Sequence, residues 1–254
     1  MNTIRYDRDH IHSRVGTTLE VHMMGATASV RCTVPFFTAA LLDDLWRLFN
    51  FNRFQGSAFI WLGCAGKYGV FQTGGHLMHM VDNRGERALK VYGEKCIRLI
   101  KSLLNHPMPT TAIVTAGCFG GGLESALCCR NFLATAEASL QFPEYNFKSF
   151  PGMSGRLFGN ELTINCLDTL NEGGLIRGPL ALHRPLPLAL VGGILKEGDP
   201  PIVGDKAVKD LVNQALDQEV AEWVERMGRL LADPVERRTI EARAKLQERL
   251  VTRA

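Results

Sequence analysis

Residues 120–155 read GGGLESALCCRNFLATAEASLQFPEYNFKSFPGMSG, and this stretch decides the fold. Its glycine triplet follows the apolar run 110–115 and precedes the short apolar segment 123–129, so a strand, a tight loop and a helix are predicted in that order. Glycine lets the backbone approach a ligand, and free N–H groups at a helix start lie at the positive end of its dipole. Such a turn can stabilise an oxyanion, although a lone triplet is more often a plain strand-to-helix connection.

Two glutamates in the same stretch are candidates for acid/base chemistry. Glu124 lies just inside the predicted helix, and Glu144 follows Phe142 and Pro143, 20 positions further on. Carboxylates in mostly apolar surroundings are energetically expensive unless something uses them. Burial would raise the pKa of each group toward the range that suits general acid/base catalysis.

The segments upstream predict a second unit of the same kind. Strands are expected at 19–24 and 28–32 with Gly25 as the turn, then a helix at 37–49, a strand at 57–64, the glycine-bearing stretch GVFQTGGHL at 69–77, a helix at 85–104 and a strand at 110–115. Downstream, strands are expected at 131–135 and 139–142. Two successive strand, glycine loop and helix units favour a layered α/β architecture.

The C-terminal part has a different pattern. Residues 173–204 are rich in glycine and proline and give no periodic signal, so no element is predicted there. Apolar positions at helical spacing then predict an amphipathic helix at 208–231, which Asp233 and Pro234 end, and a charged helix at 235–251. The sparse apolar stripe of the last helix is typical of a surface or a subunit contact.

Composition limits the possible classes of protein. The chain has 254 residues and a formal net charge of +3 from 29 basic and 26 acidic residues, so no nucleic-acid partner is expected. Seven cysteines without C-x-x-C spacing indicate reduced core residues in a cytoplasmic protein. Neither a signal peptide nor an apolar run long enough to span a membrane is recognised in the sequence.

The quoted stretch resembles the signature of the crotonase (enoyl-CoA hydratase/isomerase) superfamily. In that family a glycine triplet, one residue and a glutamate precede a helix, paired strands, Pro-Glu and a Pro-Gly-x-x-Gly turn, and GVFQTGGHL resembles the family's first oxyanion strand. The resemblance covers roughly residues 18–165. It implies an α/β, ClpP/crotonase-like fold with a repeated ββα catalytic core at 1–165. A helical C-terminal section at 166–254 would serve oligomerisation and pocket closure, in a homotrimer or hexamer.

The resemblance also implies roles for particular residues. The amides of Gly75 and Gly121 would form an oxyanion hole for a thioester enolate, and Glu124 and Glu144 fall on the two catalytic glutamates of the hydratases. Because both acids are present, hydration or dehydration is favoured over isomerisation. Lys67 matches a position that often contacts substrate phosphates, although a solvated loop lysine fits as well. The substrate would be a thioester of CoA or acyl carrier protein, with no other cofactor.

Within the superfamily, the segments 36–45, 70–77 and 142–153 resemble the diffusible signal factor synthases. Those enzymes dehydrate a 3-hydroxyacyl carrier-protein thioester and can release the unsaturated fatty acid. The sequence departs from the family at His76 and Arg130, where aspartate is usual. His76 and His79 have metal-ligand spacing, but no third ligand at a suitable spacing accompanies them. An isomerase, a hydrolase, and a non-catalytic scaffold or RNA-binding subunit remain alternatives.

Overall fold

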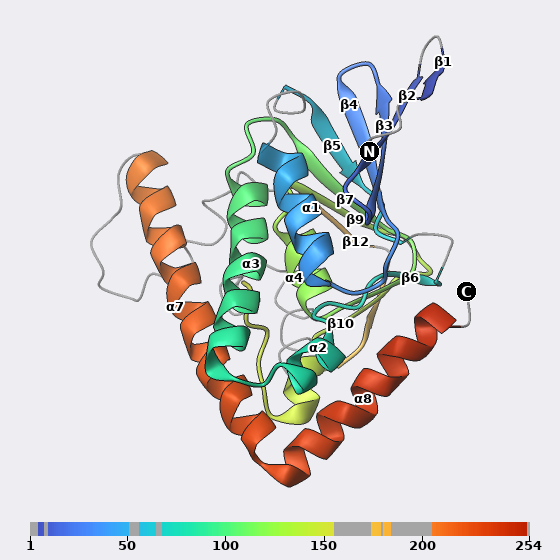
Figure 1. The fold of residues 1–254 in the computed structure, drawn as a ribbon. Coiled ribbons are helices and arrows are strands. Elements are labelled where there is room, and N and C mark those ends of the chain that lie inside the picture. Colours follow the sequence, from blue (N-terminus) through green and yellow to red (C-terminus); the bar gives the residue numbers. More distant parts are fainter. Residues whose placement is uncertain are drawn as a thin grey trace.

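The computed structural model describes residues 5–7, 10–50, 56–64, 68–154, 174–178, 180–183 and 205–252. Two sheets run through these residues (Figure 1). The larger has eight described strands in the spatial order β1 (Arg5–Asp7), β2 (His10–Val15), β3 (Leu19–Met24), β4 (Thr27–Cys32), β5 (Ala58–Trp61), β7 (Thr110–Val114), β9 (Asn131–Ala134) and β12 (Leu180–His183). The smaller has four, in the order β11 (Ile176–Arg177), β10 (Ser139–Gln141), β8 (Gly117–Phe119) and β6 (Val70–Gln72).

Helical crossovers connect the central parallel strands. Strands β4, β5, β7 and β9 pair in parallel. Parallel neighbours need a crossover connection, and a helix lies in each connection here. The helices are α1 (Ala39–Asn50), α2 (Leu77–Asp82), α3 (Glu86–Leu104), α4 (Gly121–Leu127), the 3-10 helix η1 (Pro143–Phe147), α7 (Asp205–Ala232) and α8 (Pro234–Thr252). Figure 1 shows α1, α3 and α7 side by side, while α8 turns back and packs against α2. The α/β prediction with a repeated core is confirmed.

Most predicted elements are found, and the differences concern short ones. The helices predicted at 37–49, 85–104, 208–231 and 235–251 correspond to α1, α3, α7 and α8. The sequence did not indicate β1, β2, α2 or β8, nor the strands β11 and β12 in the glycine- and proline-rich stretch. Because β11 and β12 complete the two sheets, the part of the chain beyond residue 165 is not helical throughout. The expected division at 165/166 itself lies outside the described residues.

The predicted apolar faces are buried inside the chain. The apolar stripe on α3, from Leu89 to Leu103, is buried. Helix α7 lies along α3 (Figure 1). All six described cysteines are free and buried, which confirms the core interpretation for them. Since much of the α7 stripe is covered within one chain, subunit assembly stays a prediction. Among the described residues, no helix is long and apolar enough to cross a bilayer.

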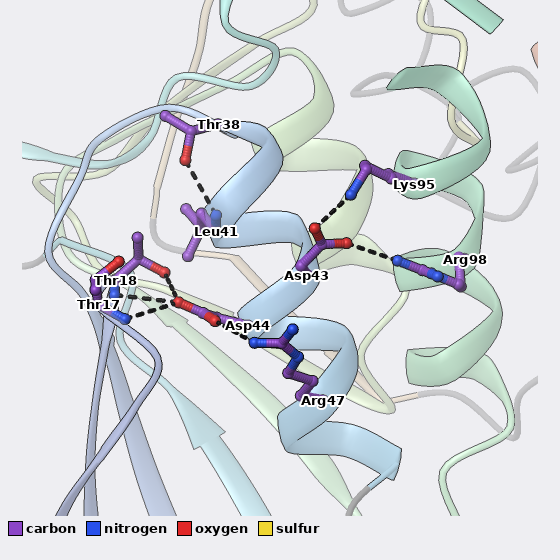
Figure 2. A network of polar contacts seen from close by, with 9 residues as sticks. All are labelled: Thr17, Thr18, Thr38, Leu41, Asp43, Asp44, Arg47, Lys95 and Arg98. Atoms are coloured by element: carbon purple, nitrogen blue, oxygen red, sulfur yellow. Dashed lines mark hydrogen bonds and ion pairs between the residues drawn. The ribbon is translucent and has the colours of Figure 1, made fainter. Parts of the chain in front are cut away.

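A buried aspartate fixes the turn between β2 and β3 to the first helix. Asp44 on α1 is 4% exposed, and its Oδ2 accepts hydrogen bonds from the Thr17 amide at 3.1 Å and from the amide and hydroxyl of Thr18 at 3.2 and 2.7 Å (Figure 2). Its neighbour Asp43 points to the other side of the helix, toward Lys95 and Arg98 on α3. Two adjacent acids therefore tie α1 to the sheet and to the helical layer.

The two acids should differ in their effect on stability. Asp44→Ala leaves two amides and a hydroxyl without their charged acceptor, so we expect it to lower the free energy of unfolding by about 2–4 kcal/mol. Asp43→Ala removes ion pairs that are partly exposed, and about 0–1 kcal/mol is expected. Urea denaturation of the two variants measures the difference, and equal losses would contradict the role assigned to Asp44.

Candidate active site

One cavity brings together the four residues that the sequence indicated as catalytic. The cavity has a volume of about 50 Å³ and lies between α3, α4, η1 and α7. The lining comprises Gly75, Leu77, Met80, Tyr92, Gly93, Cys96, Gly121, Glu124, Glu144, Phe147, Gly152, Met153, Val220, Trp223 and Met227. Most of this wall is apolar, so any charged group in it is removed from water at a cost.

The backbone before α2 aims one amide away from its neighbouring strand. The Phe37 amide donates to the Gly74 carbonyl at 2.7 Å. In a trans peptide the carbonyl and the following N–H point in opposite directions, so the Gly75 N–H is directed away from Phe37. It donates to no acceptor among the described residues. Gly75 itself lines the cavity.

The start of α4 contributes the second amide. Gly120 has φ +52° and Gly121 is the first helical residue, whose N–H has no acceptor within its own helix. A Cβ on Gly74, which has φ +82°, would come within 2.7 Å of the Gly121 nitrogen. The two glycine segments therefore pack in contact, and only glycine fits between them at Gly74.

The Glu124 carboxylate accepts two hydrogen bonds from the backbone. The side chain is on α4, is 1% exposed, and its Oε2 accepts hydrogen bonds from the amides of Met153 at 2.8 Å and Ser154 at 2.6 Å. Hydrogen bonds donated to a carboxylate favour its ionised form. These two amides were not singled out in the sequence, although they belong to the Pro-Gly turn that the resemblance contains.

Glu144 is in the opposite situation. Its Oε2 is buried and has no hydrogen-bond partner in the part of the chain that the structure describes. Burial, and then the nearby charge of Glu124, raise the pKa of Glu144 to about 8, while the backbone amide of Gly121 opposes the rise. The raised pKa favours the protonated form of Glu144, whereas the two backbone N–H groups favour the ionised form of Glu124. Unequal environments for two neighbouring acids are typical of acid/base catalysis.

The C-terminal helices complete the site. Val220, Trp223 and Met227 on α7 form one wall of the cavity, and a Cβ on Gly152 would come within 2.2 Å of the Trp223 ring. On the other side, α8 contacts the segment that carries Gly75. Part of the C-terminal section therefore lies against the site within a single chain.

Three further predicted positions have other environments or are not described. Lys67 lies outside the described residues, so its predicted phosphate contact stays untested. His76 stacks on Phe36 and its Nε2 lies 2.8 Å from Glu248 Oε1. The Arg130 amide, between α4 and β9, donates to the Thr110 hydroxyl at 3.0 Å. Among the described residues, no three His, Cys, Asp or Glu side chains are grouped as a metal site would require.

Part of the chain is similar in sequence to known proteins. Residues 37–160 match the enoyl-CoA hydratase/isomerase family. A probable enoyl-CoA hydratase of Bacillus subtilis is 29% identical over 118 residues, which cover 46% of each protein. The human peroxisomal bifunctional enzyme is 31% identical over 119 residues, which cover 46% of this chain and 16% of that enzyme. The matched region is thus less than half the length of either relative.

Solved structures show the same fold. An enoyl-CoA hydratase/isomerase from Mycobacterium paratuberculosis superposes with a TM-score of 0.64 at 16% identity, covering 89% of this chain and 98% of the other. A putative enoyl-CoA hydratase/isomerase from Bordetella parapertussis gives 0.59 at 16%, covering 89% and 97%. DspI from Pseudomonas aeruginosa gives 0.57 at 18%, covering 94% and 89%. At such identities the likeness concerns the fold.

Glu144 should make stability depend on pH. Its pKa is raised from 4.5 to about 8 in the folded protein, so folding favours the protonated form. The resulting stabilisation is fully present below about pH 4.5 and is lost as the pH rises toward about 8. Glu144→Gln cannot ionise, so relative to the wild type its free energy of unfolding should increase across this window. Parallel pH profiles from urea denaturation would contradict the buried, protonated carboxyl.

Proposed function

The chain belongs to the crotonase (enoyl-CoA hydratase/isomerase) superfamily, and on that premise we propose that it adds water to an enoyl thioester or removes water from a 3-hydroxyacyl thioester. One observation carries the proposal. Glu124 and Glu144 share one apolar cavity, where the first accepts two backbone hydrogen bonds and the pKa of the second is raised to about 8. The cavity thus offers a base and an acid to one substrate.

The amides of Gly75 and Gly121 are the proposed donors to the thioester oxygen. Adding water to an α,β double bond develops negative charge on that oxygen, where fixed donors in a water-poor site stabilise the transition state most. The Gly121 amide also interacts with the Glu144 carboxylate. A thioester oxygen would compete with Glu144 for this amide, so substrate binding would further favour the neutral form of Glu144.

The two glutamates then move the protons. In hydration, the Glu124 carboxylate takes a proton from water while the water oxygen bonds to the β-carbon. The π electrons shift to the thioester oxygen, and the enolate re-forms the carbonyl as the α-carbon takes the proton of Glu144. Glu124 ends protonated and Glu144 ionised, and transfer of one proton between them through solvent restores the start. Dehydration runs through the same steps in reverse.

The cavity wall suits an acyl chain. Leu77, Met80, Phe147, Trp223 and Met227 offer an apolar surface to the hydrocarbon part of a substrate. CoA and acyl carrier protein present the same pantetheine thioester, and either is compatible with this wall. The likeness of three segments to diffusible signal factor synthases supports 3-hydroxyacyl dehydration on a carrier protein. Fatty-acid release would need an added hydrolysis of the thioester, and a trimeric or hexameric assembly belongs to the same proposal.

Replacement of each acid by its amide tests the proposal. Glu124→Gln and Glu144→Gln keep the side-chain shape but cannot exchange a proton, so each should lower kcat by about 10²-fold or more while substrate binding persists. The double variant should be little worse than the worse single one, because residues that act as a unit are not additive. Turnover of enoyl and 3-hydroxyacyl thioesters, followed by mass spectrometry of products, measures this.

Glu94→Gln is the matched control, because Glu94 is an exposed glutamate on α3, the helix that also lines the cavity. Its activity should equal that of the wild type. If Glu144→Gln retained full activity and Glu124→Gln did not, an isomerase or another one-acid reaction would replace the proposed one. Full activity with both glutamates replaced would remove them from the mechanism.

A further inference from the structure

Gln247, near the C-terminal end of the sequence, forms hydrogen bonds with the backbone around Gly75. Gln247 on α8 is 8% exposed. Its Oε1 accepts from the Leu77 amide at 3.0 Å, and its Nε2 donates to the Gly75 carbonyl at 2.9 Å and to the Thr73 hydroxyl at 3.0 Å. A buried amide side chain with three well-formed hydrogen bonds is fixed in position.

These bonds act on a backbone that has little stiffness of its own. The peptide plane that carries the Gly75 N–H is held by the bond from Phe37 to the Gly74 carbonyl. The next plane is held at the Gly75 carbonyl by Gln247 and at the His76 amide by the Tyr92 hydroxyl at 2.9 Å. Between the two planes lies glycine, the residue with the greatest conformational freedom. The direction of the Gly75 N–H therefore depends on clamps from outside its own strand.

We propose that Gln247 is a positioning residue for the Gly75 amide. Through it, helix α8 sets how strongly the site polarises the thioester carbonyl. The inference rests on the proposed function, since it assumes that this amide serves a thioester oxygen. Gln247 does not line the cavity and need not touch the substrate. It acts by fixing the torsions on either side of Gly75 and His76.

A neighbouring contact supports the same attachment without replacing it. Glu248 lies beside Gln247 on α8, and its carboxylate contacts His76 Nε2 at 2.8 Å. The Glu248 side chain is 43% exposed, so solvent weakens its interaction with His76. It joins side chains only, whereas Gln247 bonds to the backbone on both sides of His76. Of these two α8 residues, Gln247 is therefore the one that acts on the backbone next to the Gly75 amide.

The expected effect is on catalysis more than on binding. Oxyanion donors must lie close to the position of the developing charge, and a misplacement of about 1 Å can cost about a hundredfold in rate. Gln247→Leu keeps the side chain's approximate volume but loses all three bonds. Gln247→Glu keeps the acceptor for Leu77 and loses the donor to Gly75. Both should lower kcat about tenfold to a hundredfold and leave KM within about threefold.

A chromophoric probe separates positioning from general stability. The dimethylaminocinnamoyl thioester of pantetheine absorbs at longer wavelength as its carbonyl is polarised, and it carries the part of the substrate that CoA and carrier protein share. With the probe saturating, the wild type should give a clear red shift, both Gln247 variants a much smaller one, and Gln218→Leu the wild-type value. Gln218 is an exposed glutamine on α7, which makes it a matched control. Melting temperatures show whether each variant is folded, and Gln247→Glu serves if Gln247→Leu does not fold.

Each outcome decides between the two claims. A full red shift and full kcat in a folded Gln247 variant would overturn the positioning role while leaving the proposed function intact. A loss of melting temperature with an unchanged red shift per bound probe would make Gln247 merely structural, and would also overturn it. A wild-type protein that binds the probe without any red shift would instead contradict the proposed oxyanion hole.

Discussion

Two carboxyl groups in the wall of one apolar cavity are the constraint on which the rest of the site depends. One buried charge is costly and two like charges are costlier, so the protein has to treat them differently. Glu124 receives two backbone N–H groups from the turn at Met153 and Ser154. Glu144 has a buried oxygen without a described partner, and the charge of Glu124 helps to keep it protonated. The resulting acid and base are a consequence of this unequal solvation.

Close packing also constrains the two backbone N–H donors. Each candidate amide comes from a glycine segment, because a side chain at Gly74 would strike the Gly121 nitrogen and one at Gly121 would strike the Met153 sulfur. Glycine permits the close approach but supplies no rigidity. Bonds from distant parts of the chain provide it: Phe37 before α1, Tyr92 on α3 and Gln247 on α8. The C-terminal helices therefore belong to the site as well as to the surface.

Much of this arrangement could be predicted from sequence, and the remainder depends on contacts that leave no local pattern. Long amphipathic segments such as 86–104 have clear periodicity, and Glu124 and Glu144 were found because they lie at fixed places in a motif. The strands β8, β11 and β12 have two to four residues each, too few for an alternating pattern. No local pattern indicates Gln247, because its partners lie 170 to 174 positions away. Only the folded chain reveals that one polar residue of a charged helix reaches the backbone near Gly75.

Isotope labelling of the product tests whether the protein adds water across the α,β double bond of a thioester. The wild-type protein is incubated with an enoyl thioester in water labelled with deuterium and heavy oxygen, and the acyl product is analysed by mass spectrometry. Hydration of the double bond places one heavy oxygen on the β-carbon and one deuterium on the α-carbon of the same molecule. Deuterium without heavy oxygen on the β-carbon, or heavy oxygen found only in a released carboxylate, would contradict it.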